Sequence, residues 1–510
     1  MIISLSVLVI TIIVSGTYAL YKTQLSKNIG VNTTTHGLAY YINYVKGTDI
    51  TAATLNPSTS YEGGASSDIE FWKKDDSYDI YGKIELTVNT IGTNLSNSPA
   101  LKYAVVNNGN VLKEGSLKGT TSGSKVTILK NLYLEQTKQI YTVYVWLDNS
   151  EELGNISNES LSISVDCTAS LQKEPTAADT IISLYTSAAK VTATNNSITY
   201  NTAPSVSLMN DRLGGTTTDL DGGNIRYYGA NPNNYIYFNC SDYSNQTSST
   251  CETWRIIGVF DGKLKLIKGS QIGTYSWDNK NISTGAEDDR GKNDWTTARL
   301  MKLLNPDDYY INDNNDKDSE GNYLGYSLYY NSASGMCFTD EGVNYSACDF
   351  TSTGIKNDET RNMIAETTYN LGGWNDTGVY PNEIYEYERG TTVYTGRPTT
   401  WTGKIALAYP SDYGYAADLN QCKQTLANYD NSTCTSNNWM KAIITDNGSN
   451  HGWLLTPDSS YSYVAWYSQG NVGEYFTGAA RGAVPVLSLS SKLGIESGDG
   501  SSSNPYKLSA

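Results

Sequence analysis

The stretch GWLLTPDSSYSYVAWYSQGNVGEYFTGAARGAVPVLSL, residues 452–489, decides how the second half of this chain is expected to fold. It begins with an apolar anchor, WLL at 453–455, and ends with VPVL at 484–487, which predicts a buried strand. Between these segments, QGN at 469–471 predicts a hairpin turn, and aromatic residues alternate with small polar ones. Rigid rings on loops between anchored strands are typical of a recognition surface, because they add contact area at low entropic cost.

The same stretch therefore predicts a ligand-binding surface over residues 456–481. The alternative interpretation is a tyrosine-rich hairpin that packs only against its own edge. Such a surface suits a glycan and a protein loop equally. The expected contacts are the aromatic and charged side chains of this stretch: Tyr461, Tyr463, Trp466, Tyr467, Glu474, Tyr475 and Arg481.

The pattern W-L-x-x-P, then A-W, G-N-V and G-x-x-P-V-L-x-L resembles the C-terminal half of C-type-lectin-like domains in bacterial surface proteins. These domains include the formylglycine-generating-enzyme-like fold and the variable ligand-binding proteins that retroelements diversify. The segments WRIIGV at 254–259, DGKLKLI at 261–267 and W-x-x-A-x-L-x-x-L-L-N at 295–305 are similar to the N-terminal half of the same family. The resemblance implies a lectin-like α+β domain over residues 206–510, with an insertion at about 306–400.

This chain departs from the family at its end, which usually reads G-V-R-P-V-L and here reads GAVPVL. A role of the family's arginine therefore does not transfer to Arg481. Formylglycine-generating enzymes bind copper through a cysteine pair, and no matching motif is present here, so their activity is not expected.

Six of the seven cysteines form three closely spaced pairs. The chain has no C-x-x-C and only two histidines, so zinc fits poorly and local disulfides are expected. Disulfides indicate an oxidising location outside the cytoplasm. Cys167 continues an alternating apolar row and predicts a buried, unreactive thiol. The expected pairs are Cys240 with Cys251, Cys337 with Cys348, and Cys422 with Cys434.

The first twenty residues are apolar and uncharged, and Lys22 and Lys27 follow them. This pattern predicts a signal peptide or an N-terminal membrane anchor over residues 1–27 and makes this segment the expected membrane contact. GTYA at 16–19 resembles the segment after the hydrophobic stretch of camelysin-like and biofilm-fibre proteins. Export to the cell surface is expected in either case.

Residues 28–170 predict a β-sandwich, which resembles the camelysin type at its leader and at YVWLD, 144–148. KIELTVN at 83–89 alternates strictly, and IYTVYVWL at 140–147 predicts a central strand covered on both faces. Residues 171–205 predict a helical connector, with a helix from Thr176 to Lys190, and a linker. The expected fold class is therefore mainly β with some α.

Catalytic motifs are missing from the sequence. Neither a G-x-S-x-G elbow nor H-E-x-x-H occurs, and glycine follows both His36 and His451. Asp316, Asp318 and Glu320 resemble the start of a calcium loop, but Ser327 stands where a bidentate Glu is needed. The interpretation favoured here is an acidic surface turn without a cofactor, and a calcium site is the alternative.

The net charge of −16 argues against nucleic acid as a partner. The interpretation that the sequence favours is a non-enzymatic surface recognition or adhesion protein. One alternative is a structural matrix or fibre subunit that self-assembles through the β-sandwich. A secreted carboxylate-dependent hydrolase is the other, because paired acids such as Glu287 and Asp288 abound.

Overall fold

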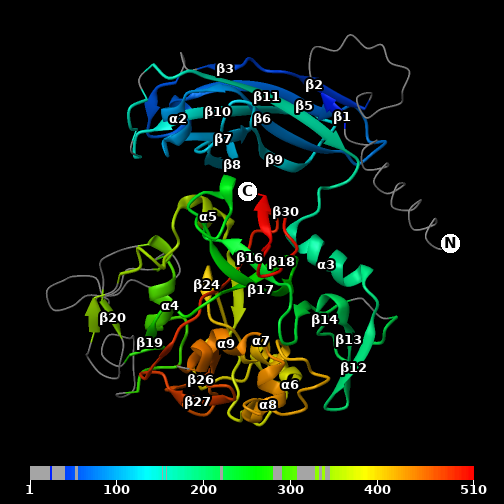
Figure 1. Ribbon diagram of the computed structural model, residues 1–510, viewed down its shortest axis with the longest axis vertical. Coiled ribbons are helices and arrows are strands. Elements are labelled where there is room, and N and C mark those ends of the chain that lie inside the picture. The colour runs from blue at the N-terminus through cyan, green and yellow to red at the C-terminus, as the bar shows by residue number, and fades with distance from the viewer. Residues whose placement is uncertain are drawn as a thin grey trace. The chain divides into compact units, whose positions relative to one another are not determined.

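The computed structural model describes residues 23–25, 41–51, 55–151, 153–156, 158–218, 222–279, 290–306, 328–331, 336–338, 345–347, 349–448 and 450–509. It divides the chain into two compact units, Met1–Glu174 and Pro175–Ala510. Strands outnumber helices in both units (Figure 1), so the expected mainly β class with some α is confirmed.

The first unit contains two sheets. One has the strand order β1-β11-β6-β9 with β3 beside β11, and the other has the order β2-β5-β10-β7-β8 with β4 beside β10. Side chains from both sheets contribute to one buried apolar core. The elements of this unit are β1 (Thr23–Leu25), β2 (Ile42–Val45), β3 (Ile50–Thr51), β4 (Pro57–Ser58), η3 (Tyr61–Gly63), β5 (Ala65–Lys73), β6 (Tyr81–Ile91), α2 (Thr93–Asn97), β7 (Leu101–Asn107), β8 (Asn110–Ser116), β9 (Lys125–Tyr133), β10 (Ile140–Asp148) and β11 (Leu161–Ser170).

The apolar residues that alternate with polar ones in the sequence of β6 form one inward-facing row in the sheet. Ile84, Leu86 and Val88 of β6 are all fully buried. Cys167 continues the equivalent row of β11, is free, and is fully buried. The prediction of a buried thiol is confirmed, and burial raises the pKa of this thiol well above its usual value, which disfavours the reactive thiolate.

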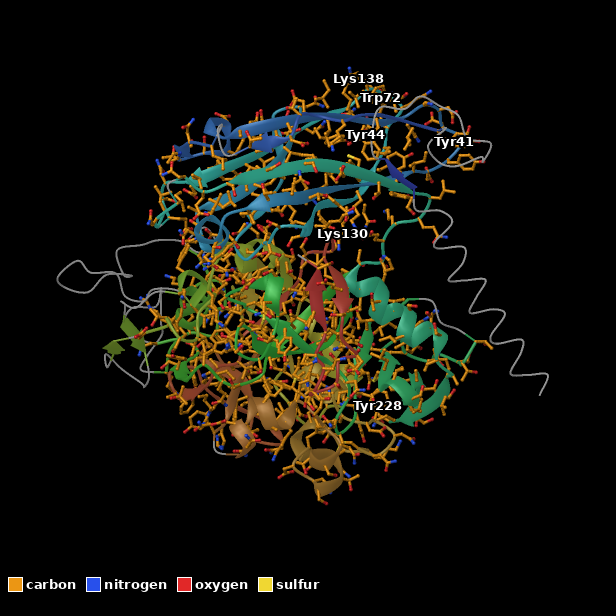
Figure 2. The ribbon with its side chains drawn as sticks, turned by 45° about the horizontal axis from the view of Figure 1, so that its top comes forward. Tyr41, Tyr44, Trp72, Lys130, Lys138 and Tyr228 are labelled. Carbon is orange, nitrogen blue, oxygen red and sulfur yellow. A yellow bond between two sulfur atoms is a disulfide. The ribbon has the colours of Figure 1, made fainter. Side chains whose placement is uncertain are left out.

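The strand predicted at 140–147 is central in its sheet, because β10 lies between β5 and β7. The expected burial on both faces is wrong, however, since Thr142 and Tyr144 are only partly buried. The Tyr144 ring lies 5.1 Å from the ring of Tyr61, which covers part of it. Figure 2 labels Lys138 and Trp72 of this unit, and Lys138 Nζ lies 5.8 Å from the centroid of the Trp72 ring.

Two predicted boundaries differ from the structure. Residues 23–25, expected in the leader, form β1 and pair with β11. The helix expected from Thr176 is present as α3 (Ala177–Ser187), capped by Thr176, but it is not a connector. Its buried side chains, among them Ile181 and Tyr185, belong to the core of the second unit. The helix lies within the second unit because its apolar stripe is buried there.

The second unit is built on a nine-stranded sheet with the order β12-β13-β14-β15-β17-β18-β29-β24 and with β16 beside β17. β12 and β13 form part of it, so the predicted linker up to residue 205 is sheet instead. The strands are β12 (Val191–Asn195), β13 (Ile198–Ala203), β14 (Leu208–Asn210), β15 (Ile225–Tyr227), β16 (Tyr235–Phe238), β17 (Glu252–Phe260), β18 (Lys263–Lys268), β24 (Ile405–Ala406) and β29 (Val486–Ser488).

A five-stranded sheet with the order β19-β28-β25-β26-β27 carries the predicted ligand surface. Its strands are β19 (Thr274–Ser276), β25 (Gly452–Pro457), β26 (Val464–Ser468), β27 (Val472–Phe476) and β28 (Ala480–Gly482). Three strand pairs are smaller: β20 (Met336–Phe338) with β21 (Tyr345–Ala347), β22 (Thr367–Asn370) with β23 (Thr400–Gly403), and β30 (Gly494–Ser497) with β31 (Lys507–Ser509).

The helices of the second unit are short, and α6, α7, α8 and α9 gather at the same end as β26 and β27 (Figure 1). They are α4 (Arg299–Leu304), α5 (Asp358–Met363), α6 (Pro381–Glu388), α7 (Pro410–Tyr415), α8 (Ser432–Ser436) and α9 (Lys441–Ile444). Single 3₁₀ turns are η4 (Pro204–Val206), η5 (Tyr243–Asn245), η8 (Leu328–Tyr330), η9 (Leu426–Asn428) and η10 (Asp446–Gly448).

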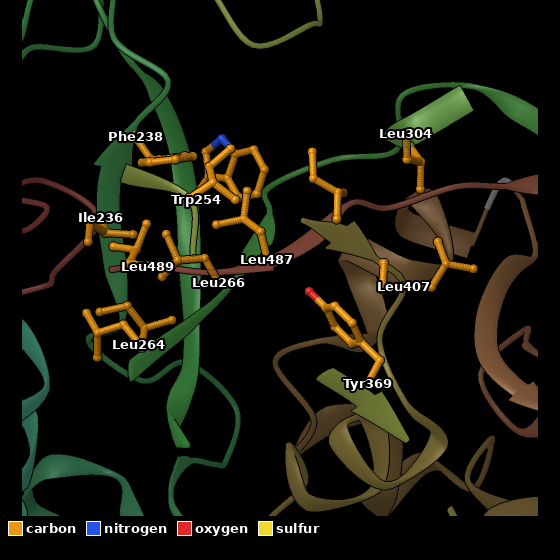
Figure 3. Close-up of a cluster of buried hydrophobic side chains, with 14 of the residues drawn as sticks. Ile236, Phe238, Trp254, Leu264, Leu266, Leu304, Tyr369, Leu407, Leu487 and Leu489 are labelled. Carbon is orange, nitrogen blue, oxygen red and sulfur yellow. The ribbon is translucent and has the colours of Figure 1, made fainter. Parts of the chain in front are cut away.

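The main core of the second unit draws on residues far apart in the sequence. Figure 3 shows Phe238 and Trp254 beside Leu266 and Leu487, and all four are buried. β29, the strand predicted from VPVL, pairs with both β18 and β24 in the nine-stranded sheet. The apolar end of the 452–489 stretch therefore ties the ligand-surface sheet to the main core.

Two local turns of this unit involve aspartate residues. Asp261 and Gly262 join β17 to β18 with φ values of 49° and 70°, as a primed hairpin turn requires. Asp294 precedes α4 without capping it, because the helix begins at Arg299 with Ala298 as its N-cap. The Asp294 carboxylate instead accepts hydrogen bonds from the backbone and hydroxyl of Thr296, which holds a turn before the helix.

Candidate ligand-binding surface

The β26–β27 hairpin divides the predicted contacts between two faces. Tyr467 lies opposite Gly473, whereas Trp466 lies opposite Glu474. Residues directly opposite each other share a face, and successive residues of one strand point to opposite faces. Tyr467 and Tyr475 therefore point to one face of the sheet, and Trp466 and Glu474 point to the other.

Trp466 is not available to a ligand, and its assignment as a contact was wrong. Its side chain is 0% exposed and belongs to a buried cluster with Leu454. The indole Nε1 donates a hydrogen bond to the carbonyl oxygen of Trp374 at 3.1 Å. Successive residues of a strand point to opposite faces, so Trp466 points into the core while its neighbour Tyr467 points to the other face.

Arg481, His451, Tyr467 and Tyr475 form what is called here the Arg481 cluster. The guanidinium carbon of Arg481 lies 4.5 Å from the ring centroid of Tyr467 and 4.4 Å from that of Tyr475. Its Nη1 lies 2.9 Å from Nδ1 of His451. Since a guanidinium can only donate, Nδ1 accepts this bond and the imidazole is neutral there. The His451 ring also stacks on Tyr467 at 5.4 Å.

Burial and charge explain the protonation of this cluster. The pKa of His451 is lowered by burial and by the positive charge of Arg481. The pKa of Arg481 is itself lowered by burial. Its Nε is buried and has no hydrogen-bond acceptor among the described residues, and Arg481 forms no ion pair within them. The cluster therefore holds a positive charge without a counter-ion in the part of the chain that the structure describes.

Tyr461, Tyr463, Phe476 and Arg290 form a second group, the Tyr463 cluster. The guanidinium carbon of Arg290 lies 3.8 Å from the ring centroid of Tyr463. The Tyr463 ring lies 5.9 Å from that of Tyr461 and 5.6 Å from that of Phe476. The rings of Phe476 and Tyr475 are 5.2 Å apart, so the two clusters are neighbours.

The loop that displays Tyr461 is fixed by hydrogen bonds from a distant segment. The side-chain amide of Asn293 donates to the carbonyl oxygens of Asp458 and Tyr461 at 2.8 Å and of Val464 at 3.0 Å. Arg397 donates through Nε to the Asn293 amide oxygen and through Nη2 to the carbonyl oxygen of Ser462, both at 3.0 Å. The loop is therefore ordered before any ligand arrives.

Asp458 adds to this order from inside the loop. It is 0% exposed, and its Oδ1 accepts hydrogen bonds from the backbone of Ser460 and Tyr461 at 2.5 and 2.7 Å. Burial raises the pKa of Glu474 to about 8, aided by the negative charge of Asp458 and by the hydrogen bond that a protonated Glu474 donates to it. The proton on Glu474 gives the buried Oδ2 of Asp458 a hydrogen-bond donor. No other donor to this oxygen is present among the described residues.

Six of the seven predicted contacts thus remain at or near the surface: Tyr461, Tyr463, Tyr467, Glu474, Tyr475 and Arg481. Sequence reasoning did not assign Arg290, His451 and Phe476 to the site. Arg290 lies far earlier in the chain, and no sequence signal connects it with Tyr463. His451 lies directly before the β25 anchor, a position that could have indicated its role.

The disulfide predictions are confirmed where the structure describes them. Cys240 is bonded to Cys251, and Cys422 to Cys434. These bonds fit an oxidising compartment. The pairing of Cys337 with Cys348 and the calcium loop at Asp316, Asp318 and Glu320 lie outside the described residues. Most of the first half of the insertion expected at about 306–400 also lies outside them.

Another charged group is too deep to bind a ligand. Arg226 contacts Asp211 at 2.6 Å and Asp412 at 2.9 Å, and Lys265 also pairs with Asp412. Burial raises the pKa of nearby Glu388 to about 7. These five side chains are almost completely buried, so this network organises the interior of the second unit.

Within the described ranges, no group of three or more His, Cys, Asp or Glu side chains is arranged to hold a metal ion. No helix among the described residues has both the length and the apolar character needed to cross a membrane.

Comparison with known proteins gives little beyond this geometry. No protein-family model matches the chain, and no curated protein matches it in sequence. Among solved structures, an acetyl xylan esterase from the rumen bacterium Butyrivibrio proteoclasticus is similar at 13% identity and a TM-score of 0.15, covering 31% of this chain and 34% of the esterase. The receptor-binding domain of botulinum neurotoxin mosaic serotype C/D is similar at 12% identity and a TM-score of 0.15, covering 50% of this chain and 74% of that domain. Neither likeness is strong enough to support a shared fold or function.

Proposed function

We propose that this chain is an exported cell-surface protein that binds a glycan or protein ligand, without catalysis, through the Arg481 and Tyr463 clusters. The observation that carries the proposal is an exposed aromatic surface on a fixed loop. Tyr461 is 53% exposed and Tyr475 is 41% exposed, while Asn293 and Arg397 bond the loop of Tyr461 in place.

Pre-ordered tyrosines favour binding for a physical reason. Each ring offers a large contact area with few rotatable bonds, so little conformational freedom is lost when a ligand is bound. The hydrogen bonds from Asn293 remove most of the remaining freedom of the backbone that carries Tyr461. A tyrosine-rich hairpin that served only its own packing would bury these rings instead of exposing them.

The proposal extends to the fold and the location of the protein. It assigns a C-type-lectin-like fold to the second unit and a camelysin-like β-sandwich to the first. The order of β25, the β26–β27 hairpin and β29 supports the first assignment, and the common core of two sheets supports the second. The apolar segment at residues 1–20 and the two described disulfides support export.

A hydrolase is the second candidate, because one observation favours it. Glu474 has a pKa raised to about 8, and a carboxyl group that stays protonated at neutral pH can act as a general acid. Its neighbour Asp458 is fully buried and engaged by the loop backbone, which argues against a second catalytic carboxylate there. Turnover of a bound ligand that disappears in Glu474→Gln would favour this candidate.

The test of binding uses the full-length, oxidised protein on a combined glycan and surface-protein array. We expect at least one specific ligand, and an affinity at least tenfold weaker in the variants Tyr461→Ala and Tyr475→Ala, because each removes an exposed ring. Tyr78→Ala is the matched control, since Tyr78 is 44% exposed and lies in the first unit. Its affinity should equal that of the unmodified protein.

Two results would contradict the proposal. One is a ligand whose affinity is unaffected by both tyrosine variants. The other is an array without any ligand together with filament formation by the full chain, which would favour a structural subunit.

A further inference from the structure

We infer that the Arg481 cluster binds the carboxylate of an acidic sugar. This inference rests on the proposed function and names the chemical class of its ligand. It starts from the charge at Arg481, which no described residue neutralises.

Three arginines of the described chain pair with carboxylates: Arg226 with Asp211, Arg361 with Asp358, and Arg389 with Glu388. Arg255 has no carboxylate partner among the described residues, but it donates hydrogen bonds to the Asn234 side chain and to the carbonyl oxygen of Pro232. Arg481 differs from all of these, because its neighbours are the neutral rings of Tyr467, Tyr475 and His451, and its Nε has no acceptor among the described residues. A guanidinium that has lost part of its water without gaining a counter-ion is unfavourable. A ligand carboxylate would supply the missing partner in a charge-assisted hydrogen bond.

The guanidinium is also held ready for this contact. Nη1 is bonded to Nδ1 of His451, and His451 is itself fixed by a 2.7 Å hydrogen bond from the backbone N–H of Gly482 to its carbonyl oxygen. The two tyrosine rings restrict the plane of the guanidinium. Because Nη1 is occupied and Nε is buried, Nη2 is the nitrogen of the guanidinium that is left to a ligand.

The rings beside the charge indicate what carries the carboxylate. The Tyr475 ring is 41% exposed and its centroid lies 4.4 Å from the guanidinium carbon, so an apolar face and a cation are presented side by side. A sugar ring can place its C–H face on tyrosine while its carboxylate reaches Arg481. The net charge of −16 repels a densely charged acidic peptide more than a sugar with one charge per ring.

The experiment compares acids with their own methyl esters. Full-length, oxidised protein is applied to an array of oligosaccharides that contain glucuronate, galacturonate or N-acetylneuraminate, each printed beside its methyl ester, with neutral glycans, surface proteins and polyglutamate as further probes. We expect binding to at least one acidic sugar and at least tenfold weaker binding to its ester. Arg481→Gln should bind the acid as weakly as the ester.

Two further variants complete the design. Lys492→Gln, which removes an exposed positive charge elsewhere in the same unit, should bind like the unmodified protein. Arg481→Lys keeps the charge but loses the planar fork, so we expect it to fall between the unmodified protein and Arg481→Gln. The acid–ester comparison needs no variant, so a folding defect in Arg481→Gln cannot hide the answer.

The outcomes distinguish a failure of the acidic-sugar inference from a failure of the proposed recognition function. Equal affinity for acid and ester, continued discrimination by Arg481→Gln, or equal binding to polyglutamate would overturn the acidic-sugar inference. Binding only to neutral glycans or to proteins would also overturn it, while leaving the proposed recognition function intact. Absence of every glycan and protein ligand would overturn both.

Discussion

Trp466 and Tyr467 are neighbours in the chain and have opposite roles in the structure. Trp466 is 0% exposed and bonded to the backbone of Trp374, whereas Tyr467 lies over Gly473 and beside Arg481. The absence of a side chain at Gly473 leaves room for the Tyr467 ring, whose Cε1 lies 3.1 Å from where a β-carbon would be. At this scale, one step along a strand separates a core residue from a contact residue.

Glu474 gives a prediction about pH. Its pKa is raised to about 8 in the folded protein, against an ordinary value of 4.5, so the folded state holds a proton that the unfolded state releases between these values. The stabilisation is complete below about pH 4.5 and is lost as the pH rises through about 8. Glu474→Gln stays neutral, so we expect it to be less sensitive than the unmodified protein to a rise from pH 5 to pH 9.

Urea unfolding of the second unit at pH 5 and pH 9 measures this difference. Between pH 5 and pH 9, we expect the unfolding free energy of the unmodified protein to fall by about 2 kcal/mol more than that of Glu474→Gln. This is less than the whole pKa shift would give, because Glu474 is only partly buried. Glu496→Gln, at an exposed position of β30, is the control and should follow the unmodified protein. Equal pH sensitivity in Glu474→Gln and the unmodified protein would rule out a proton held at this site.

At the scale of elements, the loop between β25 and β26 depends on a segment that lies far away in the sequence. Asn293 donates to three of its carbonyl oxygens, and Arg397 holds both Asn293 and Ser462. Hairpin signals in the sequence predicted the β26–β27 turn correctly, because a turn is a local structure. The anchor of the neighbouring loop could not be predicted, since nothing local connects residue 293 with residue 461.

Asn293→Ala tests this anchor. The substitution removes the Asn293 donor from the carbonyl groups of Asp458 and Tyr461, whereas the Val464 carbonyl keeps the backbone N–H of Asp458 as a donor. We therefore expect a loss of about 1–3 kcal/mol in unfolding free energy. We also expect faster amide hydrogen exchange over residues 458–464 and weaker binding of any ligand that contacts Tyr461.

Asn375→Ala is a suitable comparison, because Asn375 donates to the same loop through an exposed bond to the Ser460 hydroxyl. It should change exchange and stability far less than Asn293→Ala. A loop equally protected in all three proteins would show that the Asn293 bonds do not order it.

At the scale of the molecule, the two units have separate cores, and the described disulfides lie in only one of them. The core of the first unit and that of the second share no residue. Residues 1–174 contain only the free, buried Cys167, while both described disulfides lie in the second unit. Calorimetry should therefore show two transitions, and a reductant should lower only the one that belongs to the second unit.

The expected loss is about 2–4 kcal/mol for each disulfide that is reduced. Fluorescence and circular dichroism assign the transitions, and Cys167→Ser provides a chain in which only the second unit contains cysteine. If reductant lowered both transitions equally, the two units would not unfold independently.

The sequence by itself determined the mainly β class, the apolar strands such as β6 and β25, the turn at Gly470, and the cysteine pairs that the structure describes. Each of these follows from period-two patterning, from positive-φ turn chemistry or from short spacing along the chain. Only the tertiary structure decided that α3, β12 and β13 belong to the second unit and that Trp466 is core. It alone brought Arg290, Asn293 and His451 to the tyrosines, because these contacts join segments whose proximity is set by packing and not by local sequence.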